Sequence, residues 1–193
     1  GLERVAGGQA SAAVLHIFCP AVGTWNIDPV KATCADKNVV LLHWAKRSRG
    51  LVMNPCVAPH VSSFSAILPF RLSVRQKGSG AQILFEHLLD EASIKTDQLK
   101  LTATCHTELE CVLAILEGQA DIAFGLEHFA TKYNLAFLPV INESVDILFD
   151  RQMVFQPAFQ TLLAFCKTDG FIELADGFDG YDTSGLGEVS FNA

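Results

Sequence analysis

Residues 75–80 combine side chains and backbone suited to binding a small anion. The run Arg75-Gln76-Lys77-Gly78-Ser79-Gly80 lies between a predicted strand and a predicted helix. A glycine-rich turn at such a junction lets backbone N–H groups converge at the helix start, where the helix dipole favours negative charge. Ser79 adds a hydroxyl donor, and Arg75 and Lys77 add positive charge. A solvated turn in which Ser79 only caps the helix fits the same spacing, so the residues alone leave both interpretations open.

Two further positions are candidates for contact with a ligand. Thr107 opens the run Thr-Glu-Leu-Glu, a capping box whose hydroxyl and carboxylate satisfy amides at a helix start. Capping explains Thr107 fully, and a ligand contact would be additional. His16 directly follows a predicted strand and is the histidine best placed for a cleft, whereas His87 lies on an apolar helix face and is expected in the core.

The common signatures of catalysis and of metal binding are absent from the sequence. It contains no Gly-x-Ser-x-Gly, no His-Glu-x-x-His, no Cys-x-x-Cys and no phosphate loop with its lysine. Cys105-His106 with Cys111, and Cys56 with His60, lack the usual spacing of zinc ligands. We therefore expect no catalytic residue, no metal site, no cofactor and no enzymatic activity.

The elements that position these residues alternate along the chain, as in an α/β fold. Short apolar runs predict strands, and runs with helical periodicity predict helices over 80–91, over 108–117 and from Pro157 through Cys166. In the second helix the periodicity places Leu109, Val112, Leu113 and Leu116 on the buried face. In the first helix it places Ile83, Leu84, His87 and Leu88 there. The predicted strands are 12–17, 39–43, 51–53, 71–74, 121–124, 135–140 and 145–149.

One segment of the sequence recurs. Gly-Gln-Ala-Ser-Ala-Ala at 8–13 is echoed by Gly-Gln-Ala-Asp-Ile-Ala at 118–123, and each copy follows an apolar helical stretch and enters a predicted strand. Helix–glycine–strand junctions are common in α/β folds. Two copies with such similar residues nevertheless predict two lobes of similar construction.

Composition restricts the class of protein. Half of the 193 residues are hydrophobic, 18% are charged and the net charge is −7, which excludes a disordered, collagen-like or coiled-coil chain. The acidic total disfavours direct binding to nucleic acid. No apolar run is long enough for a membrane helix, and the first residues lack the pattern of a signal peptide. Six cysteines without paired spacing predict buried free thiols in a reducing cytoplasm.

Several segments together resemble one family. They are residues 75–80, the turn 118–121 with the following Phe124-Gly125, and the ending Gly180-Tyr181-Asp182-Thr183-Ser184-Gly185. They resemble the PBP-like substrate-binding domain, which has the type 2 periplasmic binding protein fold. This domain occurs behind a DNA-binding helix-turn-helix in bacterial regulators, some linked to molybdate or tungstate, and behind molybdopterin-biosynthesis proteins. Segments 16–26 and 47–51 are also similar, so the resemblance spans essentially the whole chain.

The sequence departs from the family's pattern at several positions. Ser11 and Cys19 stand where acidic residues are usual, and Val74 stands where Asn is usual. Ala81-Gln82 replaces Thr-Arg, which removes two anion donors at the helix start and leaves the identity of the ligand open. Members of the family carry a strand, a helix and a second strand before the part that matches Gly1-Leu2. We therefore expect those elements, and any DNA-binding domain, upstream of this segment.

The resemblance implies an α/β fold of two lobes, with mixed sheets flanked by helices and a ligand cleft between the lobes. Lobe I would comprise about residues 1–48 and 142–193, and lobe II about 49–141. Lobe II would offer the turn at 78–80, the helix start at Thr107 and Gly125 to a small anion, and lobe I would add His16 and Trp25.

The function that the resemblance implies is ligand sensing, without catalysis, by a cytoplasmic transcriptional regulator. The ligand would be a molybdate-like or tungstate-like oxyanion or a ligand related to the molybdenum cofactor. DNA would be contacted only through an upstream domain, no membrane partner is expected, and a homodimer is one option for the assembly. An exported solute-binding protein of a transporter and an accessory domain of molybdenum-cofactor synthesis are the alternatives.

Overall fold

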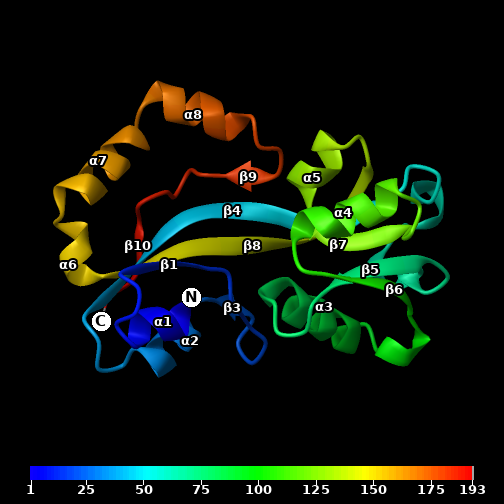
Figure 1. Cartoon of the computed structure of the whole chain (residues 1–193), viewed down its shortest axis with the longest axis horizontal. Coiled ribbons are helices and arrows are strands. Elements are labelled where there is room, and N and C mark those ends of the chain that lie inside the picture. Colours follow the sequence, from blue (N-terminus) through cyan, green and yellow to red (C-terminus); the bar gives the residue numbers. More distant parts are fainter. Residues whose placement is uncertain (193) are drawn as a thin grey trace. The chain divides into compact units, whose positions relative to one another are not determined.

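The structure is a computed structural model that describes residues 1–192. The chain divides into two compact units (Figure 1). Unit 1 combines Gly1–Arg47 with the chain from Glu143 onward, and unit 2 is Ser48–Asn142. The family resemblance implied a second lobe of residues 49–141, which begins one residue later and ends one residue earlier than unit 2. The chain passes from unit 1 to unit 2 within the long strand β4 (Val39–Met53) and returns within the long strand β8 (Ala136–Asp150).

Unit 2 is built on a mixed sheet. Strand β5 (Arg71–Arg75) lies between β6 (Lys100–Cys105) and β7 (Ile122–Leu126), parallel to both. On its other side β7 pairs antiparallel with the second half of β4, where Gly50 lies opposite Gly125. Because β5 and β6 run in the same direction, their carboxyl ends meet at one edge, with Arg75 opposite Cys105.

Helices cover both faces of the unit 2 sheet. Residues alternate between the faces along a strand, and neighbouring residues of β7 show this. Phe124 packs against Phe85 of α3 (Gly80–Glu91), whereas Ala123 packs in a cluster with α4 (Glu108–Leu116) and α5 (Glu127–Lys132). Three short 3₁₀ helices complete the unit: Ala58–His60, Phe64–Ile67 and Thr96–Gln98.

Unit 1 is built on antiparallel strands. Strand β1 (Ala12–Leu15) pairs with β8, and the short strands β9 (Tyr181–Asp182) and β10 (Val189–Asn192) both pair with β4. A separate two-stranded hairpin joins β2 (Phe18–Cys19) to β3 (Thr24–Trp25).

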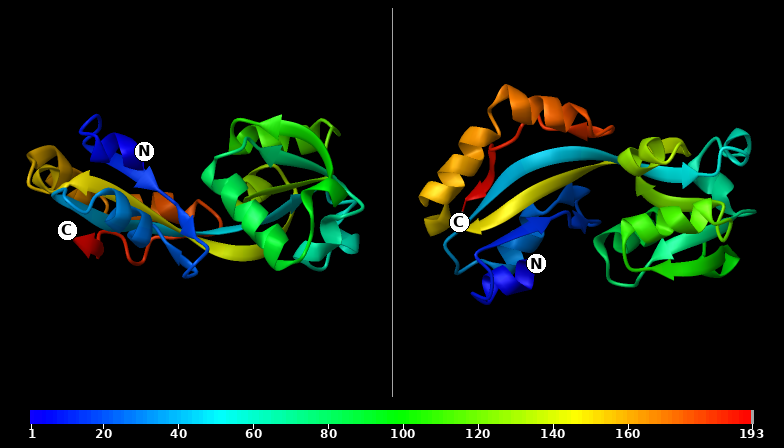
Figure 2. Two further views of the ribbon diagram at one scale, coloured as in Figure 1. Left: turned by 90° about the horizontal axis from the view of Figure 1, so that it is seen from below. Right: turned by 45° about the horizontal axis from the view of Figure 1, so that its top comes forward.

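Helices also cover both faces of the unit 1 strands (Figure 2). Leu41 and Leu148 face a cluster with α1 (Leu2–Ala6) and α2 (Ile27–Thr33). The neighbouring Val40 and Phe149 face the opposite side, where they pack with α6 (Arg151–Val154) and α7 (Pro157–Phe165). The last helix, α8 (Asp169–Asp176), follows α7.

The predicted helices are confirmed to within one residue at each end, but the strand predictions need correction. Segments 39–43 and 51–53 are parts of the single strand β4, and 135–140 and 145–149 are parts of β8. Polar residues in the middle of each strand interrupt the apolar pattern while the backbone stays extended. Strand β6 was missed because its first residues are exposed and mostly polar.

The predicted buried faces of α3 and α4 are only partly correct: Leu84 and Val112 are buried as predicted. Ile83 is 44% exposed, and besides Leu84 the buried residues of α3 are Ala81, Gln82, Phe85 and Leu89. Leu113 is 37% exposed, because α4 turns Cys111, Val112, Ala114 and Ile115 toward the sheet. The small Cys111 and Ala114 permit a close approach of helix and sheet, so the largest side chains do not mark the inner face.

The structure also tests the expectations on the repeated segment, the cysteines and membrane-spanning helices. Both copies of the echo form a helix, a turn with a glycine at positive φ (Gly8 +68°, Gly118 +70°) and a strand, as predicted. All six cysteines are free thiols, but Cys56 is exposed and Cys19 is only half-buried. Within residues 1–192, no helix has both the length and the apolar character needed to cross a bilayer.

Candidate functional site

The start of α3 lies at the carboxyl end of β5. Gly78 adopts φ +84°, a conformation that favours glycine. Ser79 is the N-cap, and its hydroxyl accepts a hydrogen bond from the Gln82 amide at 3.2 Å. The capping interpretation of Ser79 is therefore confirmed, and the glycine turn brings the chain into the helix with its first amides directed outward along the axis.

The first turn of α3 keeps amides that the protein does not use. The Ile83 amide bonds to the Ser79 carbonyl and the Gln82 amide bonds to the Ser79 hydroxyl. Within residues 1–192 no acceptor is found for the amides of Gly80 and Ala81. The first turn also contains no acidic residue, so the positive end of this helix dipole lacks a neighbouring carboxylate of its own helix.

The start of α4 follows the parallel strand β6. Thr107 caps it by accepting from the Glu110 amide at 3.1 Å, and the Glu110 carboxylate accepts from the His106 amide at 2.7 Å. The hydrogen bond from the His106 backbone is the main reason that the pKa of Glu110 lies below its usual value. The predicted capping box is therefore confirmed, and the protein's own carboxylate lies beside this helix start. Within residues 1–192 the amides of Glu108 and Leu109 have no acceptor, like those of Gly80 and Ala81.

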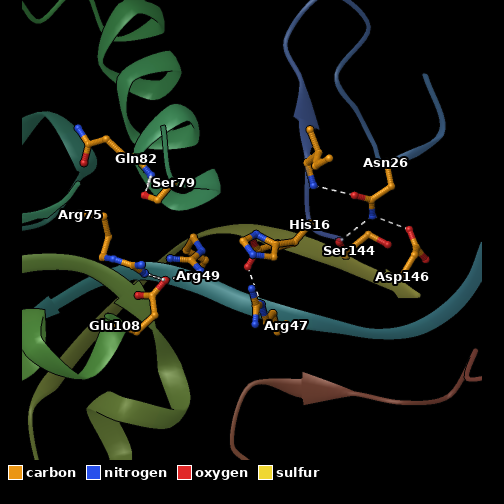
Figure 3. A network of polar contacts seen from close by, with 12 residues as sticks. His16, Asn26, Arg47, Arg49, Arg75, Ser79, Gln82, Glu108, Ser144 and Asp146 are labelled. Carbon is orange, nitrogen blue, oxygen red and sulfur yellow. Dashed lines mark hydrogen bonds and ion pairs between the residues drawn. The ribbon is translucent and has the colours of Figure 1, made fainter. Parts of the chain in front are cut away.

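A second carboxylate links two arginines beside these helix starts (Figure 3). Glu108 Oε1 lies 3.0 Å from Arg49 Nη2 and 3.2 Å from Arg75 Nη1. Arg49 is fully buried and its guanidinium lies 5.5 Å from the centre of the Phe124 ring. Arg75 also donates to the His106 carbonyl at 2.8 Å. Sequence reasoning missed both Arg49 and Glu108.

Some polar atoms of this cluster remain without partners. Arg75 Nε and Glu108 Oε2 are buried and have no hydrogen-bond partner among the described residues. Lys77 is exposed on the turn before α3. Gly125 closes the cluster from β7, since a Cβ there would lie 3.9 Å from Glu108 Oε2 and 3.1 Å from a methyl group of Val52. In unit 2 the structure thus brings Arg75 and Gly125 to Glu108, next to Thr107. Lys77, Gly78, Ser79 and Gly80 lie on the turn and helix start that follow β5.

In unit 1, His16 contacts the buried carboxylate of Glu143. Its Nδ1 lies 2.9 Å from Glu143 Oε1, and Arg47 Nε donates to Glu143 Oε2 at 2.6 Å. Burial lowers the pKa of Arg47, but attraction to Glu143 and its hydrogen bond outweigh this and raise the pKa. His16 keeps a third of its side-chain surface exposed. Trp25, the other predicted residue of this unit, packs in the β2–β3 hairpin with its ring 5.0 Å from that of Phe18.

A buried amide anchors the same hairpin. Asn26, with φ +62°, accepts from the Ile17 amide at 2.6 Å and donates to Asp146 at 2.5 Å. Asp146 also contacts Nδ1 of His43 at 3.0 Å. Ser144 Oγ approaches that same Nδ1 at 3.4 Å. A nucleophilic serine must instead contact the ring nitrogen opposite the carboxylate, so this trio does not have the geometry of a catalytic triad.

Of the three thiols considered as metal ligands, Cys56 is exposed, and the other two lie in the unit 2 core. Cys105 and Cys111 are buried in one apolar cluster with the α4 residues Val112 and Ile115. Burial, together with the neighbouring Cys105, raises the pKa of Cys111 and disfavours the thiolate that a metal requires. Among residues 1–192, no group of three or more His, Cys, Asp or Glu side chains has an arrangement that could hold a metal ion.

Comparison with known proteins identifies the family. The family model described as the PBP superfamily domain matches residues 1–167. This chain belongs to that family. The PBP domain is 21% identical over 185 residues to the uncharacterized protein YvgK of Bacillus subtilis (strain 168), and the match covers 94% of the chain. It spans 59% of the length of that relative.

Solved structures share the fold of this PBP domain. The regulatory domain of CcmR from Synechocystis PCC6803, in complex with 2-PG, matches with a TM-score of 0.62, 12% identity and coverage of 84% of this chain and 74% of that one. The effector-binding domain of QuiR with shikimate matches with a TM-score of 0.59, 13% identity and coverage of 84% and 72%. The ancestral amino acid-binding protein AncCDT-1 matches with a TM-score of 0.59 and 13% identity, and the match covers 92% of this chain and 72% of that one. The expected α/β fold of the type 2 periplasmic binding protein class is therefore confirmed.

Proposed function

We propose that this PBP domain is a non-catalytic sensor that binds a small anion at the start of α3. The observation that carries the proposal is the pair of amides, Gly80 and Ala81, that have no acceptor in a helix turn without carboxylates. The hydroxyl of Ser79 and the charge of Lys77 lie on the same turn, and the unpartnered Nε of Arg75 adds a buried donor nearby. The ligand class is an oxyanion or a small organic acid.

The strength of such a site follows from its donors. Hydrogen bonds to charged groups contribute about 1.5–3 kcal/mol each, and association costs about 4 kcal/mol or more. Two amides and one hydroxyl therefore give an affinity on the order of millimolar. Tighter binding requires the charges of Lys77 and Arg75, so these two side chains are expected to decide whether the site works at low ligand concentration.

The biological setting is part of the proposal. Domains of this fold are found with 2-PG in CcmR and with shikimate in QuiR, and both of these proteins are represented by a regulatory or effector-binding domain. These neighbours support a role in which the PBP domain senses a metabolite for a bacterial transcriptional regulator, with DNA contacted by another part of the protein. Molybdate and tungstate are the oxyanions that we propose to test first.

Calorimetry and thermal-shift measurements test the proposal. The panel is molybdate, tungstate, sulfate, phosphate, 2-PG and shikimate. We expect at least one anion to raise the melting temperature, and Lys77→Ala to weaken its binding about tenfold, which corresponds to about 1.4 kcal/mol. Lys95→Ala is the matched control, because it removes an exposed lysine beyond the other end of α3.

Two results would contradict the proposal. One is the absence of any binding by a folded domain across the panel. The other is an equal loss of affinity in Lys77→Ala and Lys95→Ala, which would mean that the anion responds to total charge rather than to the turn. Exposed lysines contribute little to folding, so both variants should keep the melting temperature of the unliganded protein.

A further inference from the structure

Helix α8 in unit 1 lies beside apolar surface that the protein does not cover. None of its residues is buried, and Ile172 and Leu174 are 48% and 59% exposed. An isolated helix of eight residues is not stable in water, so its stability must come from packing of an apolar face. That packing is incomplete here: the ring of Phe171 meets Trp44 at 6.5 Å and Phe165 at 5.7 Å.

Two adjoining cavities lie against α8, and Phe171, Ala175, Tyr181 and Thr183 line both of them. The smaller cavity, of about 200 Å³, is apolar and is lined by the rings of Trp44, Phe171, Phe178 and Tyr181. A cavity of about 150 Å³ lined by apolar side chains accepts benzene. The smaller cavity therefore has the size and the lining for one aromatic ring system.

The larger cavity, of about 500 Å³, provides polar groups next to the rings. It is lined by the hydroxyl residues Thr183 and Ser184 and by the charged residues Lys167, Asp176 and Asp182. No side-chain hydrogen bond of Thr183 is found within residues 1–192, so its hydroxyl is available to a ligand. The Ser184 hydroxyl hydrogen-bonds to Asp182 and can still accept a hydrogen bond from a ligand. These residues belong to the Tyr-Asp-Thr-Ser-Gly ending of the sequence, which the proposed anion site in unit 2 does not use.

The charges around the polar cavity are balanced. The hydrogen bonds from the Ser184 backbone and then from the Ser184 hydroxyl are the main reasons that the pKa of Asp182 is lowered, and Lys46 and His43 lower it further. Lys46 lies opposite Asp182 in the pairing of β4 with β9. The carboxylates of Asp176 and Asp182 are thus accompanied by the ammonium groups of Lys46 and Lys167, which favours a ligand without net charge.

We infer that unit 1 contains a second binding site, between α8 and β9, for a small ligand with one aromatic ring system and an uncharged or zwitterionic polar group. The ring enters the cavity of Trp44, Phe171, Phe178 and Tyr181. The polar group meets Thr183 and Ser184. A pocket of mainly apolar lining with a few convergent polar groups is the usual form of a small-molecule site. This site is independent of the proposed anion site.

Fluorescence and calorimetry test the inference with four probes: benzyl alcohol, L-phenylalanine, benzoate and benzylamine. Trp44 is one of only two tryptophans in the chain, so binding should change the intrinsic fluorescence. The change should vanish in Trp44→Phe, whereas calorimetry should still detect binding because the ring is retained. We expect the uncharged and zwitterionic probes to bind at least fivefold more tightly than benzoate and benzylamine.

Ala175→Leu places three further carbons where the two cavities meet and should abolish binding. The matched control is Ala164→Leu, the same change at an exposed position of α7, which should leave binding unchanged. Circular dichroism of both variants checks that the helices persist. No binding of any probe, tightest binding of a charged probe, or equal effects of the two alanine variants would each overturn the inference. So would self-association that Leu174→Glu abolishes, because a second copy would then cover α8.

Discussion

The starts of α3 and α4 occupy similar positions in unit 2, and within residues 1–192 each keeps two first-turn amides without an acceptor. They differ in the negative charge beside those amides. Both follow neighbouring parallel strands, and a hydroxyl residue caps each helix. In α4 the residue three positions after the cap is Glu110, whose carboxylate returns to the loop amide of His106. In α3 that position holds Gln82, whose side chain turns instead to Glu86 at 3.0 Å.

The difference shows that a capped helix start is not equivalent to an anion site. Both starts have the dipole and the hydroxyl, but α4 supplies its own negative charge through Glu108 and Glu110, and α3 supplies none in its first turn. Only α3 therefore retains the electrostatic capacity to bind an external anion.

The largest effects should come from the buried faces of the two helices. Leu84→Ala in α3 and Ile115→Ala in α4 remove side chains that are 0% and 1% exposed, and each should lower the free energy of unfolding by about 2–5 kcal/mol. Leu113→Ala, on the outer face of α4, should cost less than about 1 kcal/mol. Urea denaturation measures all three. A cost for Leu113→Ala equal to that for Ile115→Ala would contradict the described orientation of α4.

The next effect concerns the carboxylate between the arginines. Glu108→Gln removes a carboxylate that pairs with the fully buried Arg49 and should destabilise unit 2 by about 3 kcal/mol, the lower end of the cost of breaking a buried pair. Added acetate should restore part of that stability by replacing the lost carboxylate. Glu117→Gln, at the other end of α4, is the control. If the two variants unfold at the same urea concentration, the bridge does not contribute to stability.

The two caps should have equal effects on stability and unequal effects on binding. Ser79→Ala and Thr107→Ala each remove a side-chain acceptor for a helix amide, so each should lower stability by about 1 kcal/mol. Only Ser79→Ala should weaken anion binding, by several-fold, because only its helix start has no acidic residue in the first turn. Chemical denaturation and calorimetry of the same two variants give both quantities. Equal losses of affinity would remove the distinction between the helices.

The smallest effect is a pH dependence confined to α4. The folded-state pKa of Glu110 lies below the unfolded value, so its contribution to stability is present above about pH 4.3. It is lost as the pH falls through the folded pKa. Glu110→Gln should therefore flatten the acid limb of the stability curve, and Glu117→Gln should not. Thermal melts between about pH 2.5 and 6 measure it, and parallel curves for Glu110→Gln and the wild type would disprove it.

Features that depend on interactions between residues close in sequence, such as helix ends and turns, could be predicted from the sequence. The ends of α3 and α4 follow from Ser79, Thr107 and nearby glycines, because caps and turns act within a few residues. The site's charge network could not be found this way. Arg49 and Glu108 are 59 residues apart, and Asn26 and Asp146 are 120 apart, so only the fold brings each pair together. The inner face of α4 was predicted only in part, because close packing on the sheet places the small Cys111 and Ala114 there.

Amide chemical shifts of the ¹⁵N-labelled domain during titration with molybdate, and with any panel anion that binds more tightly, test the central claim most directly. The account predicts saturable shifts of the Gly80 and Ala81 amides, with those of Glu108 and Leu109 nearly unchanged, and saturation at about tenfold higher anion concentration in Lys77→Ala. Equal shifts at both helix starts, or no shift at Gly80 and Ala81 while calorimetry reports binding, would contradict it.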